Sequence, residues 1–370
     1  IVGAGEGLTY IDGSASSLGD RILDIRVGPV EISDLAINGG KALGGTLDED
    51  GGGIRNLDEL TLRRCSIMNN EAANSGGGIY TGLDSTLQMI DSSVIDNESS
   101  LGGGIGKWGG EVHMTNCEVL NNTAGIAAAS SGGGIRTTGA LVPATGGDLT
   151  IEGSTITGNT SYGWGGGVTI QEASAIIIDT SIIGNSADGA GGIRMGIGAH
   201  LDLIRGLVSN NTATSGGGLY ARNGLDLRGT TFEQKTGREG ASIYVDSGDG
   251  GMSPVPIADA TFSGNIVTEE PGSVVHVTTG TRIVGCTFTG NQGGSSVYVD
   301  FGAWLKLLNS TFDSNTGADA AVNVAATGSA TIRSSTIVRN TATTGLFGGL
   351  NGPIDIANSI VAHSVATQNC

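Results

Sequence analysis

The sequence predicts an all-β protein built as a parallel β-helix, a solenoid of about 13 coils. A template that returns about every 26 residues along the chain is the first observation, because such a period marks a repeat architecture. Within each copy apolar residues alternate with polar ones, as in a half-buried strand, and do not recur at helical intervals. Each copy therefore supplies short strands, and stacked copies bury a continuous core and pair their strands in parallel.

Residues 148–168 contain one complete copy, with Ile156 as its central aliphatic residue. The equivalents of Ile156, which we call the reference column, define thirteen coils: Ile37, Ile67, Val94, Val119, Ile156, Ile182, Val208, Phe232, Phe262, Phe288, Phe312, Ile337 and Val361. A second column lies seven residues upstream: Val30, Leu60, Leu87, Val112, Leu149, Ala175, Leu201, Leu225, Val255, Thr281, Leu305, Ala330 and Ile354. We expect each column to form one stack.

The repeat runs through the chain without a linker, so we expect a single β-helix domain over residues 1–370. Residues 1–29 form an entry segment that alternates like strands but lacks the full template, residues 30–364 carry the repeats, and residues 365–370 form a C-terminal tail. No apolar run reaches the roughly 18 residues of a transmembrane helix. The first residues already resemble a strand and turn, so we expect a processed or truncated start without a signal peptide.

An asparagine follows the reference column by three residues in most coils. Stacked amides can hydrogen-bond along a column, and asparagine tolerates the left-handed backbone of a bend between strands. We therefore expect a structural asparagine ladder made of Asn70, Asn97, Asn122, Asn159, Asn185, Asn211, Asn265, Asn291, Asn315 and Asn340. Gly40, Lys235 and Ser364 interrupt this column.

Three of the four cysteines, Cys65, Cys117 and Cys286, lie two residues before the reference column, where other coils carry serine or threonine. Cys65 and Cys117 would be two coils apart, on the order of 10 Å, which exceeds the Cα separation of a disulfide. We expect buried free thiols that pack like small apolar groups. Cys370 lies outside the repeat, and its pairing partner stays open.

Glycine triplets end many of the earlier coils, as in Gly76 to Gly78 before Ile79. One interpretation is a flat face that accepts a flat partner or a neighbouring solenoid. The interpretation we favour is that glycine supplies the backbone angles and the close approach between coils that a corner needs. In later coils the reference column becomes aromatic, which we interpret as ring stacking inside the core.

Outward residues after the strand-opening aliphatic positions form another column, and in four successive coils it reads Tyr220, Tyr244, His276 and Tyr298. Aromatic groups repeated along a solenoid suit stacking on sugar rings or contact with a protein surface, so this column is the candidate binding site. The alternative is cross-strand pairing that stabilises the sheet without a ligand.

The net charge of −18 argues against nucleic acid as a partner and against an anionic membrane surface. We expect no nucleic-acid binding and no membrane insertion by this segment. Asp48, Glu49 and Asp50 are adjacent carboxylates in a glycine-rich loop and offer oxygen ligands for Ca²⁺. A solvated acidic turn is the simpler interpretation, because the ligand spacing of a calcium loop is absent, and no other cofactor is expected.

The combination of Gly-Gly-Gly-Ile with Phe-x-x-Asn, seen at residues 262–265, 288–291 and 312–315, resembles the repeats of chlamydial polymorphic outer-membrane proteins. The chain is more similar to secreted bacterial right-handed parallel β-helix repeat proteins, whose opening and closing coils look like residues 1–13 and 358–362. The resemblance implies a right-handed solenoid that works outside the cell or on its surface, as a non-catalytic adhesin or structural stalk. The chain departs from the chlamydial repeats, because Gly-Gly-Gly replaces their Gly-Gly-Ala. The resemblance therefore does not say how the chain would be anchored to a cell surface.

A polysaccharide lyase or glycoside hydrolase is the alternative, because such enzymes also use this fold and the fold alone does not decide. Their chemistry needs clustered carboxylates beside a cleft. Only Asp202 and Asp226, with Arg228 nearby, bring two carboxylates together in their outward column, about one strand spacing apart. An exposed acidic ladder explains them more simply, so we expect no enzyme. The expected partner is a cell-surface glycan or protein, or copies of the chain end to end, since solenoid ends expose strand edges.

Overall fold

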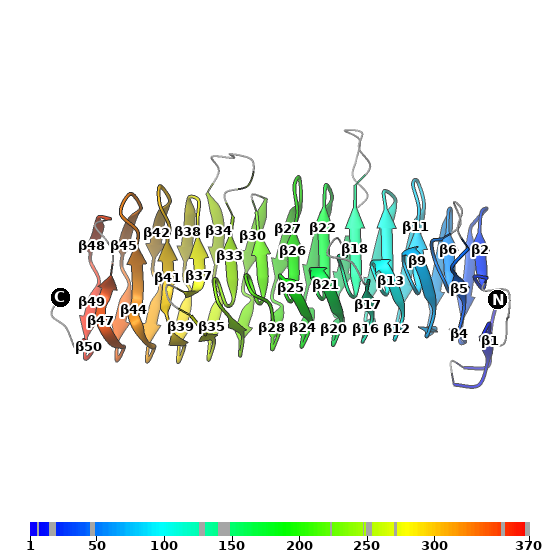
Figure 1. The fold of residues 1–370 in the computed structure, drawn as a ribbon, viewed down its shortest axis with the longest axis horizontal. Coiled ribbons are helices and arrows are strands. Elements are labelled where there is room, and N and C mark those ends of the chain that lie inside the picture. Colours follow the sequence, from blue (N-terminus) through cyan, green and yellow to red (C-terminus); the bar gives the residue numbers. More distant parts are fainter. Residues whose placement is uncertain are drawn as a thin grey trace. The chain divides into compact units, whose positions relative to one another are not determined.

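A computed structural model describes residues 1–5, 7–14, 20–44, 49–125, 130–139, 149–222, 224–246, 248, 254–269, 272–348 and 352–366. These residues form strands and turns and include no helix (Figure 1). The structure is an all-β parallel solenoid of about 12 turns, which confirms the predicted fold class. The chain folds into two compact units, Ile1–His200 and Leu201–Cys370. That the whole chain behaves as one domain stays a prediction.

Parallel strands in the first unit form four stacks. The reference stack contains β1 (Tyr10–Asp12), β4 (Ala36–Asn38), β8 (Ser66–Met68), β12 (Ser93–Ile95), β16 (Glu118–Leu120), β20 (Thr155–Thr157) and β24 (Ser181–Ile183). The upstream stack contains β3 (Val30–Ser33), β7 (Glu59–Arg63), β11 (Thr86–Ile90), β15 (Glu111–Thr115), β19 (Leu149–Glu152) and β23 (Ser174–Ile178). The third contains β2 (Leu23–Ile25), β6 (Ile54–Asn56), β10 (Ile79–Thr81), β14 (Ile105–Trp108), β18 (Ile135–Thr138), β22 (Val168–Gln171) and β26 (Ile193–Met195). The fourth contains β5 (Lys41–Ala42), β9 (Glu71–Ser75), β13 (Glu98–Leu101), β17 (Thr123–Ala124), β21 (Thr160–Trp164) and β25 (Ser186–Gly189).

The second unit repeats this arrangement. Its reference stack contains β28 (Leu207–Ser209), β31 (Thr231–Glu233), β35 (Thr261–Ser263), β39 (Thr287–Thr289), β43 (Thr311–Asp313), β46 (Thr336–Val338) and β49 (Ile360–Ala362). Its upstream stack contains β27 (His200–Ile204), β30 (Leu225–Arg228), β34 (Val255–Ala258), β38 (Thr281–Val284), β42 (Trp304–Leu308), β45 (Ser329–Arg333) and β48 (Ile354–Ala357). The remaining strands are β29 (Leu219–Ala221), β32 (Thr236–Gly237), β33 (Ile243–Val245), β36 (Ile266–Val267), β37 (Ser273–Val277), β40 (Gln292–Gly293), β41 (Ser295–Val299), β44 (Thr316–Val324), β47 (Thr341–Gly348) and β50 (Val365–Ala366).

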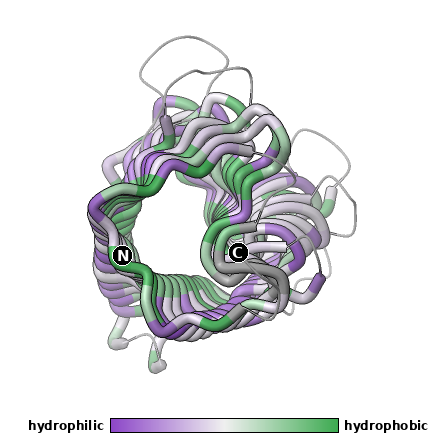
Figure 2. Tube along the Cα trace, turned by 90° about the vertical axis from the view of Figure 1, so that its left-hand side faces the viewer, coloured by the Kyte–Doolittle hydropathy of each residue, from purple (hydrophilic) through white to green (hydrophobic). Residues whose placement is uncertain are grey.

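Register within each unit follows the predicted columns. Ile67 pairs with Val94 in the first unit, and Phe232 pairs with Phe262 in the second. The entry segment also joins the stack, because Ile11 pairs with Ile37. These inward residues are fully buried from Ile37 to Ile337, and within a unit the hydrophobic segments of neighbouring coils, green in Figure 2, follow one another. The rings of Phe288 and Phe312 stack in the core with centroids 4.5 Å apart, as expected.

The asparagine amides hydrogen-bond from coil to coil inside each unit. Asn122 donates from Nδ2 to Asn159 Oδ1 at 2.9 Å and to the Val94 carbonyl at 2.9 Å. Its own Oδ1 accepts from the backbone N–H of Asn97 at 3.0 Å and from Asn97 Nδ2 at 2.9 Å. Every hydrogen-bonding position of this buried amide is thus used, and the same contacts recur between Asn265 and Asn291.

The left-handed bend does not lie at the ladder asparagine itself, contrary to expectation. It lies one residue earlier, at Asn69 (φ 52°), Asp96 (φ 53°) and Asn121 (φ 56°). That residue turns the chain, so the next side chain points inward to the stack.

The cysteine, serine and threonine side chains two residues before the reference column form a second hydrogen-bonded stack, which the sequence did not reveal. Ser154 Oγ donates to the Glu152 carbonyl at 2.9 Å and accepts from the backbone N–H of Cys117 at 2.9 Å. Cys286 takes the same position in the second unit, where its Sγ accepts from the N–H of Ala260 at 3.4 Å. Cys65, Cys117 and Cys286 are buried free thiols, as expected, and Cys370 lies outside the described residues.

The glycine triplets are buried, so they do not present a flat binding face. Gly76 has a φ of +66°, which side chains rarely adopt. A Cβ on Gly77 would lie 2.5 Å from the Gly103 carbonyl oxygen, and a Cβ on Gly78 would lie 3.0 Å from the Asn97 amide. Glycine is therefore needed for the corner and for the close approach of the next coil.

Candidate functional site

The candidate site in the second unit is the predicted aromatic column, carried by β29, β33, β37 and β41. Strand register places Tyr220 beside Tyr244, Tyr244 beside His276, and His276 beside Tyr298. The ring centroids are 5.2, 4.8 and 4.9 Å apart in that order. The structure therefore brings all four predicted residues into one row.

Exposure in this row differs from the expectation. The three tyrosines are partly buried, and His276 is only 5% exposed, so it is not the outward surface group that was predicted. Tyr244 stacks between Tyr220 and His276, and Tyr298 packs against the other side of His276 at an interplanar angle of 38°. A ligand would consequently meet ring edges and hydroxyl groups rather than the faces of these two rings.

Charged groups surround the aromatic column. Tyr220 Oη donates a hydrogen bond to Asp246 Oδ2 at 2.8 Å, and Arg222 forms an ion pair with the same carboxylate at 3.1 Å. Burial raises the pKa of Tyr220 to about 12 and, with nearby carboxylates, that of Tyr244 to about 12. Both hydroxyls thus remain neutral and able to donate across the physiological pH range.

His276 lies beside Asp300 without a hydrogen bond, since its Nε2 is 3.6 Å from Asp300 Oδ2. Neither ring nitrogen has a hydrogen-bond partner among the described residues. Burial lowers the pKa of His276, while Asp300 and Glu239 act in the opposite direction. Burial has the larger effect, which favours the neutral imidazole at neutral pH. The column thus offers neutral hydrogen-bonding groups beside carboxylates, a combination suited to hydroxyl-rich ligands.

The acidic turn proposed for Ca²⁺ is only partly described, because Asp48 lies outside the described residues. Asp50 Oδ1 accepts a hydrogen bond from Asn74 Nδ2 at 2.8 Å, and burial raises the pKa of Asp50. No group of three or more potential metal ligands occurs within the described part of the chain. Calcium binding at Asp48, Glu49 and Asp50 stays a prediction.

The carboxylates proposed for glycosidic chemistry are neighbours on the outer face of β27 and β30, where Asp202 pairs with Asp226. Arg228 binds both oxygens of Asp226, with its Nε 2.8 Å from Oδ1. A guanidinium that already holds this carboxylate leaves it poorly available as an acid or nucleophile.

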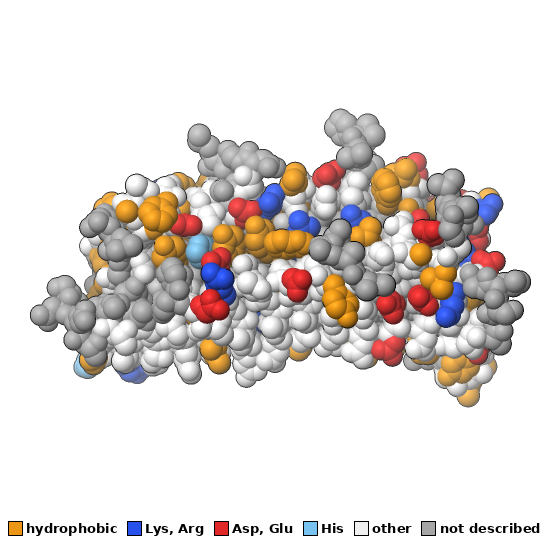
Figure 3. Space-filling view, viewed as in Figure 1, with side chains coloured by type: hydrophobic (Ala, Val, Ile, Leu, Met, Phe, Trp, Pro, Cys, Tyr) orange, Lys and Arg blue, Asp and Glu red, His pale blue; other side chains and the backbone are white. Residues whose placement is uncertain are grey.

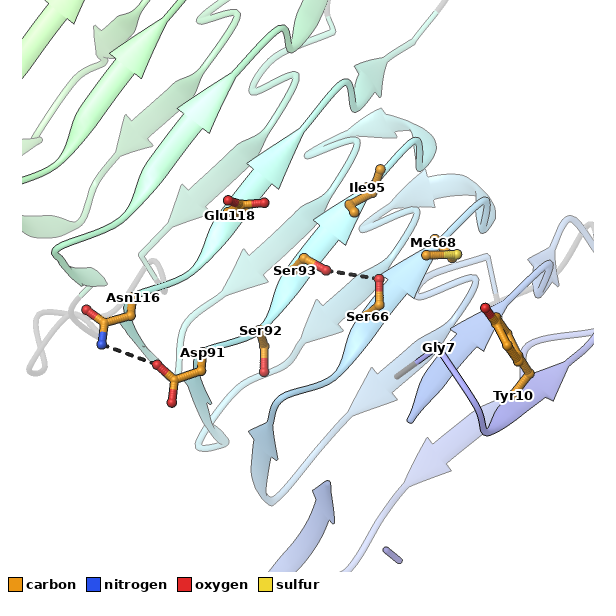
Figure 4. A pocket seen from close by; sticks show the side chains of 10 residues that line it. All are labelled: Gly7, Tyr10, Ser66, Met68, Asp91, Ser92, Ser93, Ile95, Asn116 and Glu118. Carbon is orange, nitrogen blue, oxygen red and sulfur yellow. Dashed lines mark hydrogen bonds between the residues drawn. The ribbon is translucent and has the colours of Figure 1, made fainter. Parts of the chain in front are cut away.

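An open depression of about 520 Å³ in the first unit was not foreseen from the sequence (Figure 4). Outward side chains of β8, β12 and β16 line it together with Tyr10 of the entry segment. Ser93 donates to Ser66 Oγ at 2.9 Å, and Asn116 Nδ2 donates to Asp91 at 3.2 Å. The sequence did not show that β1 pairs with β4, and this pairing brings Tyr10 to the depression.

Hydrophobic side chains also gather on one face with acidic and basic groups beside them (Figure 3). None of the described residues belongs to a helix that could cross a membrane.

The class defined by these observations is a parallel β-solenoid with stacked side-chain columns inside and outside the coils. Residues 138–337 match the family model of the right handed beta helix region, more than half of the chain. The chain therefore belongs to the right-handed β-helix family, which confirms the predicted handedness. No curated protein matches it in a sequence comparison.

Proposed function

We propose that this chain is a non-catalytic β-helix protein that works outside the cell or on its surface, as an adhesin or structural stalk. The aromatic column is the observation that carries the proposal. The four rings lie in one register, and the three partly exposed tyrosines among them bring hydroxyl groups near Asp246 and Asp300. A cell-surface glycan fits such a row, because its hydroxyls can pair with tyrosine hydroxyls and carboxylates.

The interior supports a stalk role. Stacked amides, interrupted at Lys235 in the second unit, and stacked serine, threonine and cysteine side chains satisfy buried polar groups and hold successive coils in one register. The Phe-x-x-Asn resemblance to polymorphic outer-membrane proteins agrees with a surface location. Instead of a glycan, the partner in this surface role could be a protein or further copies of the chain joined end to end.

A glycan array tests the binding site. Wild-type protein should bind a subset of glycans, and Tyr244→Ser with Tyr298→Ser should reduce that signal. Tyr162→Ser is the matched control, because Tyr162 is 57% exposed and lies outside the column. Unchanged binding by the double variant would exclude the aromatic column as the site.

Three further measurements test the class, the location and the assembly state. Incubation with a panel of polysaccharides should yield no new reducing ends and no unsaturated products, and either product would favour the lyase or hydrolase alternative. Antibody labelling of intact source cells should detect the protein at the surface, and exclusive labelling after permeabilisation would contradict the location. Light scattering at high concentration distinguishes single chains from end-to-end assemblies.

A further inference from the structure

Arg136 occupies an unusual place on the outer face of the first unit. It lies on β18, and strand register aligns it with Thr169 on β22, which in turn aligns with Arg194 on β26. Two arginines therefore project from one column, and the coil that carries Thr169 lies between them. Thr169 between them is fully buried and donates its hydroxyl to the Trp164 carbonyl at 3.2 Å.

Arg136 has no carboxylate partner among the described residues. Its Nε donates one hydrogen bond, to Ser131 Oγ at 3.0 Å. Most other arginines of the chain are held by Asp or Glu: Arg26, Arg55, Arg63, Arg64, Arg222, Arg228, Arg238, Arg333 and Arg339. In a chain with a net charge of −18, a partly buried arginine without an acidic neighbour is an exception that calls for a counter-charge.

The electrostatics around Arg136 are unfavourable in the absence of a ligand. Burial lowers the pKa of Arg136, and the nearby charge of Arg194 lowers it further. A partly desolvated cation beside a second cation costs free energy unless an anion compensates it. An anion placed at this point would be attracted by both guanidinium groups.

An indole ring packs against Arg194, one coil along from Ser131, the residue that Arg136 contacts. Trp164 is bridged to Ser131 in parallel register, and the Arg194 guanidinium carbon lies 4.9 Å from the centroid of the Trp164 ring. The Trp164 residue is 37% exposed, so part of this side chain remains accessible. A guanidinium near a partly accessible indole can bind an acidic sugar, with its anion on the guanidinium and its ring on the indole.

We propose that Arg136, with Arg194 and Trp164, forms a binding site for a carboxylate or sulfate group of an anionic glycan. The free N–H groups of Arg136 would hold two oxygens of the anion side by side, a geometry that lysine does not reproduce. This site lies in the first unit and does not depend on the aromatic column of the second.

Affinity electrophoresis in gels that contain dextran sulfate, polygalacturonate or neutral dextran tests the site. We expect retardation of the wild-type protein by one or both anionic polymers and none by dextran. Arg136→Gln should weaken the retardation about tenfold, since it removes a charge-assisted bidentate contact, and Arg136→Lys should retain only part of it. Retardation by only one anionic polymer identifies the anion as sulfate or carboxylate, and retardation by both shows that the site accepts either group.

Arg63→Gln is the matched control, because it removes the same charge from a partly exposed, ion-paired arginine of the same unit. If Arg136→Gln and Arg63→Gln lose the same amount of retardation, the change in net charge alone explains the effect, and the proposal is overturned. Absence of wild-type retardation by both anionic polymers would overturn it as well, and stronger retardation by polyglutamate would replace the glycan with an acidic protein. At equal ionic strength, sulfate should also raise the Tm of wild type by more than it raises the Tm of Arg136→Gln. The melting transition of Arg136→Gln in the same measurement shows that the variant folds.

Discussion

Lys235 stands where most coils carry a ladder asparagine, and its side chain is completely buried. Its backbone N–H still donates to Asn265 Oδ1 at 3.1 Å, but among the described residues Nζ reaches only the Glu233 carbonyl oxygen, at 3.2 Å. Burial lowers the pKa of Lys235 from its ordinary 10.5 to about 6, against a weaker opposing effect of the Glu233 charge. Folding at neutral pH must therefore remove a proton from this lysine.

The cost follows from linkage between proton binding and folding. Between about pH 6 and 10.5 the unfolded chain holds this proton and the folded chain does not, so stability rises with pH across that window. The penalty is about 5 kcal/mol at pH 7 and about 2 kcal/mol at pH 9, at about 1.4 kcal/mol per pH unit. Below about pH 6 the lysine is protonated in both the folded and the unfolded chain, so the free-energy penalty no longer changes with pH.

Replacement by a neutral side chain should remove the penalty. We expect Lys235→Asn to raise the free energy of unfolding by about 5 kcal/mol at pH 7, and this advantage should shrink by about 3 kcal/mol at pH 9. Lys235→Met is the control that removes the charge without adding an amide to the ladder. Urea unfolding followed by far-ultraviolet circular dichroism at pH 7, 8 and 9 gives both differences. An advantage of Lys235→Asn that is equal at pH 7 and pH 9 would refute the reasoning.

Other predictions concern the stacks and the corner. Asn122→Ala should lower the free energy of unfolding by at least about 3 kcal/mol, because it leaves buried partners in two coils without hydrogen bonds. The exposed Asn74→Ala should change the same denaturation midpoint little, and comparable losses would contradict a special role of the ladder. Ala190 has a φ of 59°, so Ala190→Gly should raise the free energy of unfolding by about 1 kcal/mol, and a lower thermal midpoint would count against backbone strain. Burial raises the pKa of Cys117 to about 11, so a thiol reagent at pH 8 should modify it only after unfolding. Cys117→Ser should change stability by less than about 1 kcal/mol, as serine fills this position in other coils.

The coil register was predictable because period and alternation both depend on burial. A residue such as Ile67 lies on Val94 because each must face the core at the same point of its coil. The asparagine ladder was predictable for the same reason, since a polar residue that recurs at an inward position must pair with its equivalents. The serine and cysteine column shared this periodicity, but small side chains gave no sign that they also hydrogen-bond between coils.

Features of the outer face were harder to predict. Alternation shows that His276 points away from the core, but its burial between Tyr244 and Tyr298 depends on how neighbouring rings and turns pack around it. Arg136 likewise looks like any outward arginine in the sequence. Its lack of a carboxylate is a property of the surrounding coils, which are far apart in the chain.

The coil-to-coil amide contacts give the solenoid a modular length. Asn265 donates from Nδ2 to Asn291 Oδ1, and Asn291 donates in the same way from its Nδ2 to Asn315 Oδ1. Removal of residues 266–291 would therefore leave the Asn265 donor facing the Asn315 acceptor with the same chemistry. A deletion of half a coil would instead place apolar side chains where amides belong. Such a protein is free to lengthen or shorten by duplication and loss of whole turns, while every intermediate size keeps a paired interior.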